Sequence, residues 1–137
     1  MLKTILSLTL CTCIVSCAPA VKFTERNVNI VMAKDAERGK GPIGITDTFT
    51  LEGKIVAYST FTWDEVQKEG GYHNITAKWY SGEKLVSSRD YRGSFTRPPY
   101  YVWFWTNATT FGPGKAKVEI YADGLLVGTK NFEVVTK

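Results

Sequence analysis

The amino-acid sequence predicts an all-β protein, an antiparallel β-sandwich of about seven or eight strands. Short segments that alternate apolar and polar residues recur between residues 26 and 135, and this alternation is the period of half-buried strands. Glycine, proline, asparagine and aspartate close these segments. No long stretch shows helical spacing. A closed barrel and a mixed α+β fold are the alternatives that the pattern leaves open.

The first 80 residues contain four of the expected strands. They are residues 26–33, a strand beginning with Phe49 and Leu51, residues 55–63 and residues 75–79. Residues 34–44 are charged and rich in glycine, so we expect a loop there. Residues 64–71 are polar and end in two glycines, which indicates a loop or a single helical turn.

In the rest of the chain, turn-forming residues again separate the expected strands. The expected strands are residues 85–91, 100–106, 116–121, and 125–128 followed by 131–135. Pro98 and Pro99 cannot lie inside a central strand ladder, so they introduce the strand at 100–106. Asp123-Gly124 is the strongest short hairpin signal in the chain.

The composition favours a single folded domain. The 137 residues match the usual domain size of roughly 100–150 residues, which excludes a multidomain enzyme. Hydrophobic residues make up 44% and charged residues 22%, which is typical of folded rather than disordered chains. The formal net charge of +4 is mild.

The closing segment carries a resemblance to a known fold family. Residues 114–134 read Gly-x-x-Lys-Val-Glu-Ile-Tyr-Ala-Asp-Gly-x-x-Val-Gly-x-x-x-Phe-x-Val. With Trp79 at mid-strand, this pattern resembles bacterial immunoglobulin-like domains. The resemblance implies a sandwich with Trp79 in the core and a final hairpin on one edge. The three cysteines all lie within the first 17 residues, so the disulfide of antibody domains is absent.

The beginning of the chain predicts export. Lys3 precedes an apolar run at residues 4–15, which is typical of a secretory signal. The run ends in Ile14-Val15-Ser16-Cys17, which resembles the bacterial lipobox. That resemblance implies cleavage after Ser16 and attachment of palmitate-type acyl chains to Cys17. An ordinary signal peptide, cleaved after Ala18 or Ala20, is the alternative.

This interpretation divides the chain into three parts. Residues 1–16 are the cleaved signal peptide, residues 17–24 the lipidated N-terminus with a short tether, and residues 25–137 the immunoglobulin-like domain. Because Ala18 rather than aspartate follows Cys17, the lipoprotein resemblance implies the outer membrane of a bacterial envelope. Export also argues against a nucleic-acid partner.

The sequence offers no catalytic or metal-binding constellation. His73 is the only histidine, and we expect it to be an exposed or hydrogen-bonded loop residue. A zinc site needs three or four ligands, and no Gly-x-Ser-x-Gly or phosphate-binding loop occurs. We therefore expect neither an enzyme nor a cofactor or metal.

The aromatic run at residues 100–105 is the candidate binding element. A strand places Tyr101, Trp103 and Trp105 on one face, and a sandwich core needs only one of the two faces. The other face either forms a covered cladding of aromatic pairs or an exposed binding platform. Arg92 and Arg97 precede the run and suit carboxylate or phosphate groups.

We expect the protein to be a membrane-anchored envelope lipoprotein without catalytic activity. It would make protein–protein contacts as an accessory or structural subunit. The alternative is a module that binds glycan or lipopolysaccharide through Tyr101, Trp103 and Trp105 with the neighbouring arginines. A further alternative is a periplasmic enzyme inhibitor.

Overall fold

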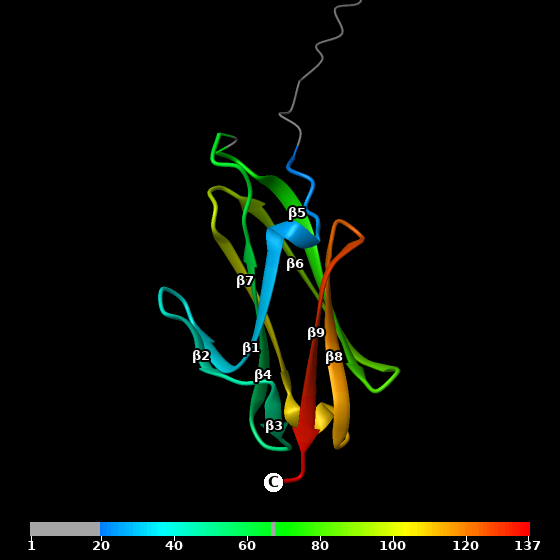
Figure 1. Ribbon diagram of the computed structural model, residues 1–137. Helices are drawn as coiled ribbons and strands as arrows, with labels where there is room; N and C mark the ends of the chain where they lie inside the picture. Colours follow the sequence, from blue (N-terminus) through cyan, green and yellow to red (C-terminus); the bar gives the residue numbers. More distant parts are fainter. Residues whose placement is uncertain (1–19, 67) are drawn as a thin grey trace, which may run out of the picture.

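Two β-sheets pack face to face in the computed structural model (Figure 1), which describes residues 20–137 except residue 67. One sheet has four strands in the spatial order β2 (Gly41–Ile45), β1 (Val28–Glu37), β4 (Lys54–Phe61) and β7 (Tyr100–Asn107). The other has five strands in the order β3 (Thr48–Thr50), β9 (Leu125–Val135), β8 (Gly114–Ala122), β5 (Gly71–Ser81) and β6 (Lys84–Phe95). Two single 3-10 turns, η1 (Glu25–Asn27) and η2 (Ala108–Thr110), complete the described part. The predicted signal peptide and Cys17 lie outside the described residues.

The strand order is that of an immunoglobulin-like sandwich. β1, β4 and β7 lie side by side as strands A, B and E do in an immunoglobulin domain, and β9, β8 and β5 as strands G, F and C. β6 pairs with β5 in the position of the extra strand found in variable-type domains. The all-β class and the sandwich architecture expected from the sequence are therefore confirmed.

The core forms from one face of each sheet. Along β5, every second residue from His73 to Trp79 is buried, and β8 alternates in the same way. Trp79 is fully buried and makes edge contacts with Phe111 and Phe132. The core position that the immunoglobulin resemblance implied for Trp79 is confirmed, because strand alternation points it at the opposite sheet.

The predicted hairpin at Asp123-Gly124 is confirmed. Both residues have positive φ, 50° and 84°, which is the backbone that a tight two-residue hairpin turn requires. The hairpin of β8 and β9 does not form the sheet edge, however, because β3 pairs with β9 and covers it. This pairing is parallel, so the expectation of a purely antiparallel sandwich is wrong at this one strand.

The predicted loop at residues 34–44 is wrong. β1 continues to Glu37 and β2 returns along it, with Ala33 opposite Ile45 and Asp35 opposite Ile43. This hairpin projects beyond the sandwich, so most of its residues are exposed and show no apolar alternation. The described residues therefore form nine strands, which is more than the expected seven or eight.

The folded domain begins before residue 25. Phe23 is buried in the core, 5.1 Å from Phe61 between ring centroids. The N–H of Val21 donates to the carbonyl oxygen of Gly70 at 2.9 Å. Residues 21–24, which the sequence assigned to a tether, are thus part of the domain because the apolar Phe23 closes one end of the core.

Candidate functional site

The outer face of the four-stranded sheet carries a cluster of aromatic side chains. Tyr58 comes from β4, and Tyr101, Trp103 and Trp105 come from the neighbouring β7. We call these four residues the aromatic face. The ring planes of Trp103 and Tyr58 are 14° apart and their ring centroids are 5.6 Å apart. The ring centroids of Tyr101 and Tyr58 are also 5.6 Å apart. Such cross-strand aromatic pairs stabilise a sheet.

Strand alternation and register together build this face. β4 and β7 pair so that Tyr58 is opposite Trp103 and Val56 is opposite Trp105. The intervening residues of β7, Val102 and Phe104, point into the core and are buried. The predicted division of the aromatic run between two faces is therefore confirmed.

Two members of the aromatic face are partly open to solvent. The exposed fraction is 48% for Tyr101 and 43% for Trp105. The Arg89 guanidinium of β6 lies 5.5 Å from the Trp105 ring centroid, and the ammonium of Lys54 lies 5.9 Å from it. Both distances fall within the range of cation–π attraction, so two cations approach the Trp105 ring.

A groove of about 480 Å³ lies beside the aromatic face. Its lining includes Tyr58, Tyr101 and Trp103, together with Tyr91 of β6 and Arg38 from the turn between β1 and β2. No carboxylate lines it among the described residues. The carboxylates nearest in sequence to Arg38 already have cation partners: Asp35 pairs with Lys54 at 2.7 Å, and Glu37 with Lys40 at 3.1 Å. The groove therefore combines flat apolar rings with unopposed positive charge.

A hydrogen bond between two tyrosines connects the two sheets at the groove. The hydroxyl oxygens of Tyr91 and Tyr100 are 2.6 Å apart, and this hydrogen bond connects β6 of one sheet to β7 of the other. Burial and the bond to Tyr91 raise the pKa of Tyr100 to about 12, although the Arg38 cation opposes the change. Burial also raises the pKa of Tyr58. Both phenols are thus neutral at ordinary pH.

The structure brings together only part of the predicted set. Tyr101, Trp103 and Trp105 lie on one face, as expected from alternation. Arg92 pairs with Asn74 on the outer face of the five-stranded sheet, away from the aromatic face. Arg97 is exposed in the connection between β6 and β7. The cations near the aromatic face are instead Arg89 and Lys54, which approach Trp105, and Arg38, which lines the groove.

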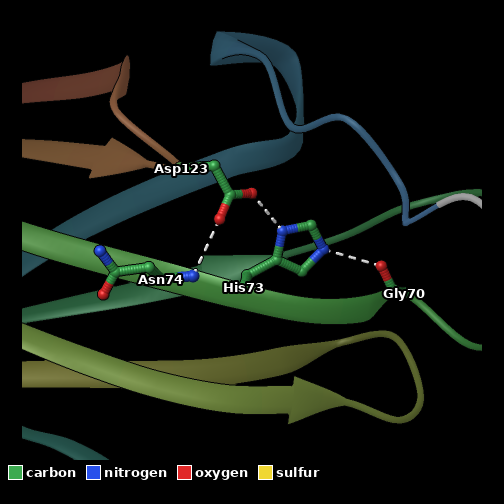
Figure 2. Close-up of polar contacts among 4 residues, drawn as sticks. All are labelled: Gly70, His73, Asn74 and Asp123. Atoms are coloured by element: carbon green, nitrogen blue, oxygen red, sulfur yellow. Dashed lines mark hydrogen bonds and ion pairs between the residues drawn. The ribbon is translucent and has the colours of Figure 1, made fainter.

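His73 belongs to a second polar cluster, at one end of the sandwich (Figure 2). Its Nδ1 lies 2.6 Å from Oδ2 of Asp123 and its Nε2 lies 2.7 Å from the carbonyl oxygen of Gly70. The other carboxylate oxygen of Asp123 accepts the N–H of Asn74 at 2.9 Å. An imidazolium ring donates at both nitrogens, whereas a neutral ring leaves one of these two oxygens without a donor.

Aromatic rings and hydrogen-bond acceptors surround the His73 ring. His73 is only 1% exposed and lies against the rings of Phe23 and Phe95. A nucleophile would have to face the nitrogen opposite the carboxylate, and a backbone carbonyl occupies that position. His73 is a buried strand residue, so the expectation of a loop position is wrong. It ties β5 to the β8–β9 turn and to the segment before β5.

Within residues 20–137 other than residue 67, no group of three or more metal-ligating side chains is assembled. The same part of the chain contains no helix with the length and hydropathy of a membrane span.

Comparisons with known proteins find similarity among solved structures. No protein-family model matches the chain, and no curated protein sequence matches it. Among solved structures, it is similar to an immunoglobulin-like protein from Pseudomonas aeruginosa, with a TM-score of 0.49 and 10% sequence identity. The alignment covers 79% of this chain and 91% of that protein.

Proposed function

We propose that this protein is a lipid-anchored envelope protein that binds a protein partner through its aromatic face. One observation carries the proposal: large aromatic side chains occupy the side of a sheet that the core does not use. Soluble proteins seldom leave such a surface open unless it is an interaction site. Tyr, Trp and Arg are also the residues that dominate binding energy in protein interfaces.

The apolar surface extends beyond the aromatic rings. Ile45 is 67% exposed and pairs with Ala33, which lies buried with Val56 and Tyr58 on the same outer face. Ile43, 41% exposed, follows on β2. Branched aliphatic side chains offer no flat ring on which a sugar can stack, whereas they readily contact apolar anchors of a protein. This extension favours a protein partner over a glycan.

The two arginines at this site indicate the charge that a fitting partner surface carries. Arg38 lines the groove and Arg89 lies over Trp105, and arginine binds carboxylates through paired hydrogen bonds. The partner surface that fits this site carries an apolar anchor with acidic residues around it.

The anchor part of the proposal rests on Ile14-Val15-Ser16-Cys17. Acylation of Cys17 places the domain at the outer membrane, and three acyl chains hold a protein at a bilayer durably, since stable anchoring takes about two. Metabolic labelling with palmitate tests it: the parent should incorporate label and partition into detergent, and a Cys17→Ser variant should do neither. An unlabelled parent would contradict the anchor.

Site-specific photo-crosslinking in intact envelopes tests the binding face. A crosslinking amino acid at position 105 or 45 should give an adduct of one defined mass. The same probe at Thr129, exposed on the five-stranded sheet, is the matched control and should give none. Equal adducts at all three positions, or none at any, would refute the assignment of this face.

Glycan binding is the second candidate, and the pair of cations on Trp105 favours it, since anionic sugars suit such a site. Titration with lipopolysaccharide or peptidoglycan fragments should change tryptophan fluorescence if this candidate holds. A Trp105→Phe variant should then lose most of the change, because Trp105 is an exposed tryptophan with two cations near its ring.

A further inference from the structure

We propose that the end of the sandwich where the described chain begins rests on the lipid surface, with Val66, Leu125 and Leu126 inserted among the headgroups. The inference relies on the proposed acylation of Cys17 and goes beyond it, because an anchor alone would leave the domain free to tumble. It concerns a surface separate from the aromatic face.

Several turns gather at this end of the molecule (Figure 1). Val21 bonds to Gly70, and the N–H of Gly70 donates to the carbonyl oxygen of Phe95 at 2.7 Å, which joins the first residues to the β4–β5 connection and to β6. The β8–β9 turn is fastened here as well, because the N–H of Asp123 donates to the carbonyl oxygen of Asn74 at 2.8 Å. These hydrogen bonds join the first described residues to the β4–β5 connection and β6, and the β8–β9 turn to β5; we call this end of the sandwich the platform.

Exposed apolar side chains are concentrated on this platform. Val66 is 91% exposed, Tyr72 63%, Leu125 50% and Leu126 41%. Apart from these, the large exposed hydrophobic residues of the described chain lie on or beside the aromatic face, with the exception of Leu85 in the β5–β6 hairpin. A single exposed leucine needs no explanation, but four such residues at one end of a sandwich favour contact with an apolar phase.

The short link between Cys17 and the described residues indicates that this apolar phase is the lipid bilayer. Cys17 precedes Val21 by four residues, which span at most about 13–14 Å at 3.3–3.6 Å per residue. Acyl chains on Cys17 lie in the bilayer, so this end of the sandwich is held within that distance of the hydrocarbon boundary. The interfacial layer of a bilayer is itself roughly 5–8 Å thick, so a link of this length lets the exposed side chains enter it.

The charges at this end are of both signs. Lys22, Arg26 and Lys68 are exposed, and so are Glu25, Glu65 and Glu69. Attraction to anionic lipid therefore contributes little, and the contact depends on apolar insertion. It should occur equally on vesicles of phosphatidylcholine and on the same vesicles with phosphatidylglycerol added.

Depth-sensitive fluorescence on the mature lipoprotein tests the inference. An environment-sensitive dye is attached to Val66→Cys, to Leu125→Cys, or to Glu52→Cys at the opposite end as the control. In vesicles, dyes at positions 66 and 125 should shift to shorter wavelengths and be quenched by lipid-borne nitroxide. The dye at position 52 should behave as in water.

A second variant pair separates insertion from simple proximity. Val66→Asp should reduce quenching of the dye at position 125 at least several-fold, whereas Leu85→Asp should leave it unchanged. Dyes at 66 and 125 that stay aqueous on a palmitate-labelled protein would overturn this inference alone. Absence of palmitate labelling would overturn it together with the proposed anchor, and quenching only on phosphatidylglycerol vesicles would overturn apolar insertion.

Discussion

Trp103 of β7 stacks on Tyr58 of β4, with 5.6 Å between ring centroids and 14° between ring planes. Tyr58 is buried beneath this contact and Trp103 is half-buried. The pair therefore fixes the floor of the groove before any partner arrives, which lowers the entropy cost of binding. The more exposed Tyr101 and Trp105 flank it on the same strand.

Replacing Trp105 should separate binding from folding. Trp105→Ala removes a ring that is 43% exposed, so we expect the free energy of unfolding to fall by less than about 1 kcal/mol. The crosslinked partner should nevertheless be lost. Urea denaturation followed by tryptophan fluorescence measures the first effect, and envelope crosslinking from position 45 measures the second.

Trp79→Ala is the comparison for that experiment. Trp79 is completely buried between the two sheets, and removing a buried Trp costs about 3–5 kcal/mol. A Trp105 variant as unstable as the Trp79 variant would mean that the aromatic face is structural cladding.

Neutralising Asp123 should loosen one end of the sandwich. Asp123→Asn keeps a residue that tolerates positive φ but loses the charged acceptor of His73, whose Nδ1 lies 2.6 Å away. Hydrogen bonds to charged groups contribute about 1.5–3 kcal/mol, and we expect a loss of that order in unfolding experiments. Asp47→Asn, an exposed position with no side-chain hydrogen bond among the described residues, is the control and should be nearly neutral.

Alkaline pH should destabilise the protein through Tyr100. The pKa of its phenol is about 12 in the fold against an ordinary 10.0, so the unfolded chain loses this proton first as pH rises. The stability contributed by the neutral phenol is complete below the ordinary pKa and disappears as pH rises through the folded value. Denaturation midpoints at increasing pH measure the loss, and Tyr100→Phe should flatten it. An unchanged alkaline decline in that variant would assign the effect to other tyrosines.

Gly70 should not tolerate a side chain. A Cβ there would lie 2.9 Å from Cζ2 of Trp63 and 3.0 Å from Cβ of Phe95. Overpacking of this kind costs typically about 1–3 kcal/mol, and thermal unfolding of Gly70→Ala should show it. At Gly112 a Cβ meets nothing within 4 Å, so Gly112→Ala should unfold at nearly the parent temperature.

Alternation predicted the strands that have one buried face. β5, β7 and β8 each place every second side chain in the core, so their apolar period is visible in the sequence. β2 and most of β6 are exposed, which leaves no period to read. β3 has three residues and pairs with β9 far along the chain, and no local pattern encodes such a contact.

The contrast between local alternation and contacts between distant segments also explains which residues of the candidate site the sequence predicted. Tyr101, Trp103 and Trp105 share a strand, so their common face follows from local alternation. Arg92 lies in β6 three residues after Arg89, so alternation places the two on opposite faces of the sheet, and it is Arg89 that lies near the Trp105 ring. Arg38 reaches the groove from a hairpin that the sequence predicted as a loop, so only the tertiary structure could bring it to the aromatic rings.

The first described segment, before β1, and the C-terminus lie at opposite ends of the sandwich (Figure 1). The last strand, β9, has 11 residues and spans roughly 36 Å at its usual rise per residue. A fluorescent protein fused after Lys137 would therefore lie about one strand length from the surface that the first described residues contact. Energy transfer from it to a dye at that surface would report the orientation of the domain, because the distance is greatest when β9 is perpendicular to the surface.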